Sequence, residues 1–187
     1  EKVKSGRVPL VITEGKTDVQ HLRAAKKRLN IRDCDVEFFD VTGDWGDSKL
    51  KLLLEQLSKV PQQRNIIGIF DRDVIKIVEE IEKDERFYKS FGNNVFAFCL
   101  PVPAGREKYS NISIEFFYKD SDLQSERDGR RLYFDNEVSI VQNQANKASK
   151  KLIKNTEPDL DYENTKKIFD ENIGSTNWIH SKAIFSS

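Results

Sequence analysis

The chain is poor in the residues that bind metals or form cross-links through sulfur and imidazole. It has two cysteines and two histidines in 187 residues. Cys34 lies beside charged residues and Cys99 lies in an apolar stretch far along the chain, which predicts two reduced thiols rather than a disulfide or a metal pair. His21 and His180 differ too much in position and context to suggest a zinc site, and each is predicted to lie on a helix surface.

Long apolar runs and an excess of charge are missing as well. No run approaches the ~18 apolar residues of a membrane span, and no signal peptide is recognisable. Lys+Arg and Asp+Glu both number 31, so a polyanionic partner must be met by a local basic patch. The Gly-x-x-x-x-Gly-Lys-Ser/Thr pattern is absent, and the chain therefore lacks an ATP-binding loop of its own. We expect a soluble, cytoplasmic protein, and the ending Phe185-Ser-Ser suggests a piece of a longer polypeptide.

What the sequence does contain is an alternation of apolar strand patterns with helical patterns. Helical spacing begins near Thr17 or Asp18, near Asp47 or Ser48, and at Val74, and strands are expected over residues 8–13, 35–41, 65–70 and 95–100. This order predicts an α/β, Rossmann-like fold with a central, mostly parallel four-stranded sheet flanked by helices. We expect a core over residues 1–125. A mainly helical extension is expected over 126–187, including helices at 162–171 and 178–185.

Acidic residues follow two of the predicted strands. Glu14 and Asp18 come after the first strand, with Gly15 allowing a tight turn, and Asp71 and Asp73 come after the third. The carboxyl ends of parallel strands share one edge of a sheet, so these carboxylates should gather there. Carboxylates that gather repel one another unless a hard cation neutralises them, which predicts Mg²⁺ or Mn²⁺. Helix capping and solvation are the alternative roles for each acid taken alone.

A third acidic segment is Ser113-Ile-Glu115. Glu115 sits among apolar and aromatic residues, where a charged group needs a partner. A metal would supply one, with Ser113 adding a hydroxyl from the same side. A solvent-facing glutamate on an amphipathic element is the alternative.

Several basic residues are candidates for contacts with phosphates. Arg72 is predicted to bind a carboxylate or a phosphate. Among the clusters at 23–28, 127–131 and 147–154 we favour Arg130 and Arg131, because they follow the Glu115 segment closely. Solvated helix faces explain each cluster equally well.

Glu14-Gly15 at the end of the first strand and Asp71-x-Asp73 at the end of the third resemble the Toprim domain. That fold is shared by topoisomerases, bacterial primases, the ribonuclease that matures 5S ribosomal RNA and the overcoming-lysogenization-defect (OLD) nucleases. The resemblance covers residues 8–118 well and the remainder loosely. Arg72 departs from the pattern, because many members have a small residue there.

Further features are similar to the OLD group. These are the spacing from Glu14 to Asp18, the pair Ser113 and Glu115, which matches an extra metal-ligand motif, and a late lysine, for which Lys182 is the best positional match. The resemblance implies a site for two Mg²⁺ or Mn²⁺ ions, with ligands Glu14, Asp18, Asp71, Asp73, Ser113 and Glu115.

The same resemblance implies a function. Glu14 would double as a proton carrier and Lys182 would neutralise the phosphate during DNA phosphodiester hydrolysis. The OLD group further implies defence against phage or plasmid DNA, with an ATPase on the same chain or on a partner. No motif places a tyrosine as a covalent nucleophile, which favours hydrolysis over strand transfer. An RNA-processing nuclease, a catalytically silent binding or assembly module, and a homo-oligomer stay open.

Overall fold

The computed structural model describes residues 8–31, 34–42, 45–109, 112–142, 150–155, 168–169 and 178–179. The chain divides into two compact units, Glu1–Pro101 and Val102–Ser187. The division falls directly after the last strand of the α/β pattern, earlier than the predicted boundary between residues 125 and 126. Each unit is described by itself.

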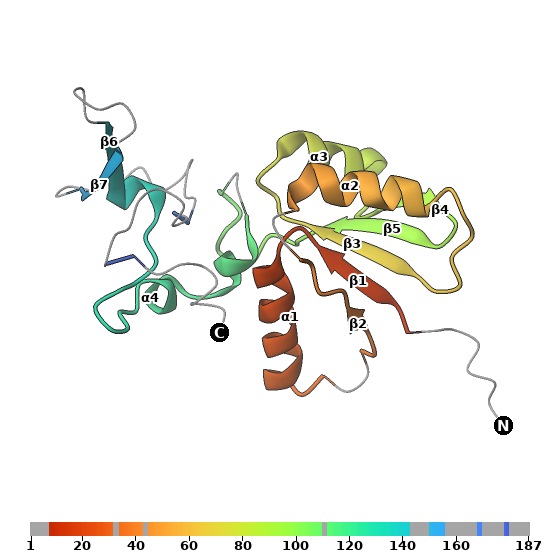
Figure 1. The fold of residues 1–187 in the computed structure, drawn as a ribbon, viewed down its shortest axis with the longest axis horizontal. Helices are drawn as coiled ribbons and strands as arrows, with labels where there is room; N and C mark the ends of the chain where they lie inside the picture. Colours follow the sequence, from red (N-terminus) through yellow and green to blue (C-terminus); the bar gives the residue numbers. More distant parts are fainter. Residues whose placement is uncertain are drawn as a thin grey trace. The chain divides into compact units, whose positions relative to one another are not determined.

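The first unit is built on a five-stranded sheet (Figure 1). Its strands are β1 (Leu10–Thr13), β2 (Glu37–Phe38), β3 (Ile66–Phe70), β4 (Lys89–Gly92) and β5 (Val95–Cys99). They are arranged in the order β2-β1-β3-β5-β4, with β1, β2, β3 and β5 parallel and β4 antiparallel to β5. The predicted α/β class and mostly parallel sheet are confirmed, and the architecture is compatible with a Rossmann-like fold. The edge strand β4 was not predicted, because its sequence Lys-Ser-Phe-Gly lacks an apolar run.

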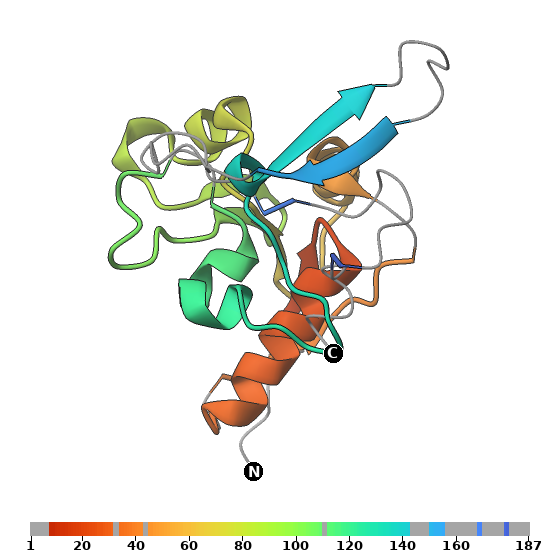
Figure 2. The same ribbon diagram turned by 90° about the vertical axis from the view of Figure 1, so that its left-hand side faces the viewer.

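Three helices flank this sheet, as predicted. They are α1 (Lys16–Arg28), α2 (Gly46–Leu57) and α3 (Ile75–Ile81), and α3 is followed by the short turn η1 (Lys83–Glu85). Figures 1 and 2 show α1 on one face of the sheet and α2 and α3 on the other. The core under α2 and α3 includes Ile12, Leu54, Phe70, Ile77 and Val95. Alternate residues of β3 and β5 face these helices, which gives both strands the burial pattern of period two.

One glycine sets how closely α2 approaches the sheet. A Cβ on Gly68, in the middle of β3, would lie 2.4 Å from Cδ1 of Leu54 on α2. Two non-bonded carbon atoms do not come so near, so a larger residue at this position would displace the helix or the Leu54 side chain. Gly68 therefore lets the fully buried Leu54 pack directly on the strand backbone.

The helix starts differ from the prediction. The N-cap of α1 is Gly15 rather than Thr17 or Asp18, and Asp18 caps from inside the first turn by accepting the Gly15 N–H at 2.9 Å. The N-cap of α2 is Trp45 rather than Asp47 or Ser48, and the helix begins at Gly46 with a left-handed φ of 68°. His21 is 3 % exposed under α1, so its predicted place on a helix surface is wrong.

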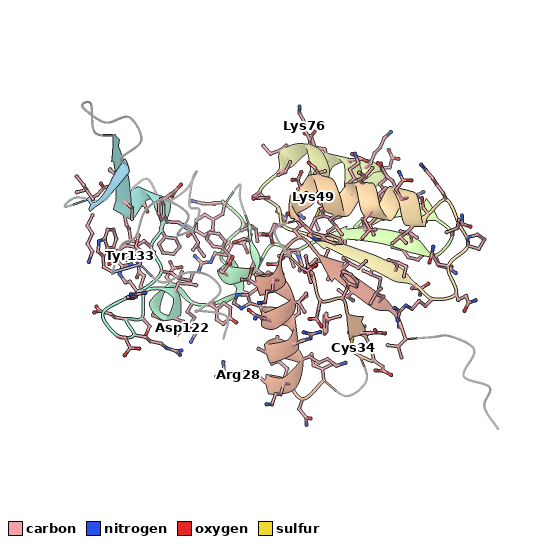
Figure 3. All side chains as sticks on the ribbon, in the orientation of Figure 1. Arg28, Cys34, Lys49, Lys76, Asp122 and Tyr133 are labelled. Carbon is pink, nitrogen blue, oxygen red and sulfur yellow. The ribbon has the colours of Figure 1, made fainter. Side chains whose placement is uncertain are left out.

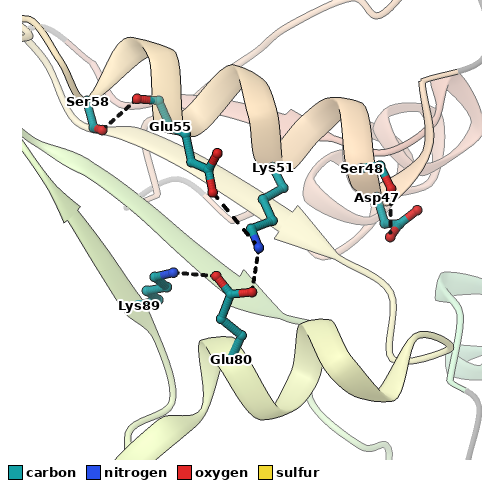
Figure 4. Close-up of polar contacts among 7 residues, drawn as sticks. All are labelled: Asp47, Ser48, Lys51, Glu55, Ser58, Glu80 and Lys89. Carbon is teal, nitrogen blue, oxygen red and sulfur yellow. Dashed lines mark hydrogen bonds and ion pairs between the residues drawn. The ribbon is translucent and has the colours of Figure 1, made fainter.

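An ion network joins α2, α3 and β4 (Figure 4). Glu80 on α3 accepts Lys51 Nζ from α2 and Lys89 Nζ from β4, each at 2.5 Å. These two hydrogen bonds hold the pKa of the Glu80 carboxyl below its usual value. The network fixes the two helices that follow β2 and β3, and with them the loops at the carboxyl edge of the sheet.

The described residues of the second unit form short helical turns and one hairpin. Its elements are η2 (Ile114–Phe117), α4 (Asp120–Leu123), η3 (Asp135–Glu137), β6 (Val138–Gln142) and β7 (Lys150–Lys154). Its main apolar cluster contains Ile112, Phe116, Leu123, Leu132 and Phe134. β6 and β7 pair antiparallel over five residues each, so the predicted helical character is wrong for this part of the extension. The Val-Ser-Ile-Val-Gln sequence of β6 has the β-branched residues that favour a strand.

The helices predicted at 162–171 and 178–185 fall almost wholly outside the described residues. Of these segments the structure describes residues 168–169 and 178–179, and Ile168 and Ile179 form isolated bridges with Phe134 and Arg131. Cys34 is exposed, Cys99 is buried, and both are free thiols as predicted. In the part of the chain that the structure describes, no helix has the length and apolar character to cross a membrane.

Candidate active site

The strand order brings the two acidic segments together. β1 lies between β2 and β3, so the chain moves from β1 to one side for β2 and then returns to the other side for β3. In open α/β sheets such a reversal leaves a crevice at the carboxyl ends of the two neighbouring strands, where ligands bind. Thr13 pairs with Ile69 in register, so Glu14 and Asp71 follow neighbouring strand ends.

Glu14 is tied to both loops that flank it. Its Oε1 accepts the backbone N–H of Asp71 at 2.9 Å, which joins the ends of β1 and β3. Its carbonyl oxygen accepts the N–H of Gly46 at 3.2 Å, which joins the end of β1 to the start of α2. Thr13 Oγ1 donates to the carbonyl of Gly15 at 2.8 Å and shapes the turn. The side chain is therefore held at the centre of this edge.

The surroundings of Glu14 disfavour its charge. Burial is the largest cause, and the charges of Asp73, Asp18 and Asp47 act in the same direction, while the Asp71 N–H opposes them. Together they raise the pKa of Glu14 to about 8. This carboxyl is therefore mostly protonated at neutral pH. A strongly perturbed carboxyl in a crevice is typical of functional sites.

The other predicted acids reach this edge by different routes. Asp18 turns back from α1 toward the strand end, where its Oδ2 meets the Gly15 N–H. The chain bends at Arg72 and Asp73, so this segment is not extended and its alternate side chains need not point the same way. The charge of Asp73 nevertheless helps to raise the pKa of Glu14. Asp71 is half-buried and Asp73 is exposed.

Asp47 belongs to the same group, although it was predicted only as a helix cap. It lies in the first turn of α2 and contributes to the raised pKa of Glu14. The signal that could have identified it is its position. It follows the second strand, and that strand neighbours the first one.

Arg72 was predicted to contact a carboxylate or a phosphate, and its partner in the structure is a carboxylate. Its guanidinium pairs with both oxygens of Glu82 at 2.5 and 2.8 Å and donates to the carbonyl of Leu100 at 3.3 Å. The pKa of Arg72 is raised by this pairing. Such a bidentate, half-buried pair anchors the loop after β3 to α3, which leaves the predicted contact with nucleic acid without support.

The donors at this edge suit a hard divalent cation in their chemistry. They are carboxylate oxygens from separate loops, and a cation would offset the repulsion among them, which adds to burial in raising the pKa of Glu14. Among the residues that the structure describes, however, no three Asp, Glu, His or Cys side chains are grouped tightly enough to hold a metal ion. The carboxylates would have to turn inward from their present hydrogen bonds to bind one.

Ser113 and Glu115 lie in the second unit and form a pair of their own. Glu115 is 1 % exposed, and Ser113 Oγ donates to its Oε2 at 2.5 Å. The hydroxyl and the carboxylate are therefore on the same side of the segment, as predicted. This hydroxyl is therefore one partner of the buried Glu115 carboxylate.

The basic candidates of the second unit are engaged in local structure. Arg131 pairs with Glu137, the closest contact being 2.8 Å, and its guanidinium lies 3.7 Å from the centre of the Tyr133 ring. Arg127 and Arg130 exchange backbone hydrogen bonds of 2.8 and 2.9 Å around a two-residue turn. Asp128-Gly129 supplies the two positive φ angles that this turn requires. Lys182 lies outside the described residues.

A comparison of the chain with protein-family models, with curated proteins and with solved structures finds no significant match. The carboxylates at the β1–β3 edge are therefore the basis of the functional proposal.

Proposed function

We propose that this chain is a Toprim-type, divalent-metal-dependent nuclease that hydrolyses DNA phosphodiester bonds. The observation that carries the proposal is the gathering of Glu14, Asp18, Asp47 and Asp73 at the β1–β3 edge, where burial and then the charges of the other three acids raise the pKa of Glu14 to about 8. Asp71 adds a further acid at this edge and binds Glu14 through its backbone N–H. The Toprim resemblance of the sequence agrees with this location.

In the proposed site, Glu14, Asp18, Asp71 and Asp73 hold Mg²⁺ or Mn²⁺. The bound ions would stabilise negative charge on the attacking and leaving oxygens of the phosphodiester.

Glu14 is the residue that we assign to proton transfer. Its Oε1 already accepts the Asp71 N–H, so a proton on this carboxyl resides on Oε2. Without a bound ion, this carboxyl has a pKa of about 8 and holds a proton near neutral pH, and a cation beside it would favour the release of that proton. Lys182 is proposed as the cation that meets the phosphate, and a cytoplasmic role in defence against foreign DNA, alongside an ATPase, follows from the resemblance alone.

A second candidate is a catalytically silent module with the same fold. It is favoured by the internal hydrogen bonds of the site, in which the Asp18 carboxylate accepts the Gly15 N–H and the Glu14 carboxyl accepts the Asp71 N–H. Both acids could then serve to fix turns rather than to bind ions. Cleavage by the intact chain separates the two candidates.

The direct test is nicking of supercoiled plasmid in the presence of Mn²⁺. We expect Glu14→Gln and Asp71→Asn to slow nicking by about a hundredfold or more, because each removes a carboxylate from the reacting group. The matched controls are Glu79→Gln and Asp84→Asn, which alter exposed acids of the same unit, and both should nick at the rate of the unmodified chain.

The other outcomes are equally informative. Metal-dependent nicking that survives both site changes would remove these acids from the mechanism. Cleavage of structured RNA but not of plasmid would favour the RNA-processing alternative, and no cleavage of either would favour the silent module.

A further inference from the structure

The outward face of α1 carries a line of cationic side chains that begins beside the acid site. Lys16, Gln20, Arg23 and Lys27 are spaced by four, three and four residues, which puts them on one side of a helix. Lys16, Arg23 and Lys27 are exposed and Gln20 is half-buried. We call these four residues the α1 track.

Helix stability accounts for only one end of this track. Lys26, Lys27 and Arg28 lie in the last turn of α1, where cations interact favourably with the helix dipole. Lys16 lies in the first turn, where that dipole favours an acid. The cation at the start of the track is therefore opposed by helix energetics, although it lies directly after Gly15 at the edge that holds Glu14.

Asp18, the single acidic residue of α1, does not belong to the track. Its carboxylate accepts the N–H of the N-cap residue Gly15. The buried residues of α1 are Val19 and His21, and neither belongs to the track. The helix thus buries these two side chains and leaves the three cations of the track exposed.

At the far end, the track opens into a hollow of about 440 Å³ beside β2. It is lined by Arg23, Lys26, Lys27, Asn30, Ile31 and Phe38. Figure 3 shows Arg28 at this same end of α1. Arg23 pairs with Asp40 at 2.6 Å, and because both side chains are largely exposed, at 46 % and 75 %, this pair is weak enough for a phosphate to compete.

We propose that the α1 track binds the phosphodiester backbone of a nucleic acid that leads away from the carboxylate edge. The direction of this path rests on the proposed function, whereas the binding itself requires no cleavage. Lys16 and Lys27 are separated by ~16 Å at 1.5 Å per residue. That length corresponds to about five base pairs at 3.4 Å each. The contacts are to phosphates and carry no sequence preference of their own.

The experiment measures binding of a fluorescein-labelled duplex DNA by anisotropy, in EDTA, at a series of salt concentrations. The test variant is Lys16→Gln/Arg23→Gln/Lys27→Gln in the full chain. The matched control is Lys59→Gln/Lys83→Gln/Arg86→Gln, which removes two lysines and one arginine from exposed positions after α2 and α3. Circular dichroism confirms that each variant is folded.

We expect the test variant to bind about tenfold more weakly or worse, and the salt dependence of log Kd to fall by about 2.7, or ~0.9 for each lost phosphate contact. The control should stay near the unmodified chain. Equal salt slopes for the unmodified chain and the test variant would overturn the proposal, as would an equal loss in the control. A loss of binding to phosphatidylserine vesicles with unchanged binding to duplex would assign the track to a membrane instead.

Two additional arms separate this proposal from the proposed function. Duplex RNA as the probe distinguishes the source of the phosphates. Glu14→Gln should keep its affinity for the duplex in EDTA even where it no longer nicks plasmid. If nicking proves independent of Glu14 while the track still binds, the proposed function fails and the track stands.

Discussion

The two units each withdraw a carboxyl group from water, and they do so in opposite ways. Glu115 in the second unit is fully buried and receives the Ser113 hydroxyl, a neighbour two residues away. Glu14 in the first unit is only partly buried, yet three other acids act on it from α1, α2 and the loop after β3. The first arrangement finds its partner locally, and the second gathers like charges from distant parts of the chain. Gathered like charges destabilise the fold unless a ligand compensates, which is why the first unit is the better candidate for a site.

Divalent cations should separate the two units most strongly. An ion at a hundredfold excess over its Kd would stabilise the folded first unit by about 2.7 kcal/mol. Trp45 reports on this unit and Trp178 on the other, so thermal unfolding of a Trp178→Phe chain followed by Trp45 fluorescence measures the effect. We expect the midpoint to rise with Mn²⁺.

Two variants test whether that rise comes from the carboxylate edge. Asp73→Asn should lose most of the Mn²⁺ effect, because it removes one of the gathered charges. Asp84→Asn, an exposed acid of the same unit, should keep it. A rise of equal size in both variants would locate the ion elsewhere.

Removal of the local partner in the second unit should have the next largest effect. Ser113→Ala takes a hydrogen bond from a carboxylate that is 1 % exposed, and we expect a loss of about 1–3 kcal/mol in the free energy of unfolding. Denaturant unfolding of a Trp45→Phe chain, followed by Trp178 fluorescence, measures it. Ser139→Ala removes an exposed hydrogen bond to Asn155 in the same unit and should lose about 0.5 kcal/mol or less. Equal losses would show that the buried Ser113–Glu115 hydrogen bond contributes no more to stability than the exposed Ser139–Asn155 hydrogen bond.

Neutralising Glu14 should have an effect of opposite sign, which depends on pH. Its pKa rises from 4.5 to about 8 on folding, so the folded chain binds the extra proton. The contribution of Glu14 to stability is therefore fully present below pH 4.5 and is lost as the pH rises through 8. Glu14→Gln removes this loss. In EDTA the variant should be more stable than the unmodified chain at pH values above 8 and equally stable below pH 4.5. The Trp45 transition of the Trp178→Phe chain measures it, with Glu79→Gln as the unaffected control. A variant less stable at high pH would refute the assigned surroundings of Glu14.

The parallel sheet could be predicted because its central strands are recognisable from their sequences. Ile66–Phe70 and Val95–Cys99 are continuous apolar runs between helical patterns, and they occupy the centre of the sheet. The edge strand β4 could not be found in this way, since Lys89 and Ser90 pair through the backbone and gain little from burial. β6 was missed because its polar surroundings resemble those of an exposed helix.

The site was predictable to the extent that strand ends determine it. Glu14 and Asp71 follow β1 and β3 whatever their side chains do. The hydrogen bond between them, the pairing of Arg72 with Glu82 and the approach of Asp47 depend on loop geometry that no local pattern encodes. Arg72 is an example. A cation between two acids suggests a contact with phosphate, and only the folded chain shows that Glu82, at the end of α3, is its partner.

The missing side chain of Gly68 has an effect beyond packing. A Cβ at this position would lie 2.4 Å from Cδ1 of Leu54, so a larger residue must displace that leucine or α2, the helix whose first turn carries Asp47. Asp47 is one of the acids that raise the pKa of Glu14, so Gly68 is linked to Glu14 through α2 although it has no polar side-chain atom. A family of chains with this architecture could tune its acid chemistry by changing one small residue in the middle of a buried strand, without touching any carboxylate.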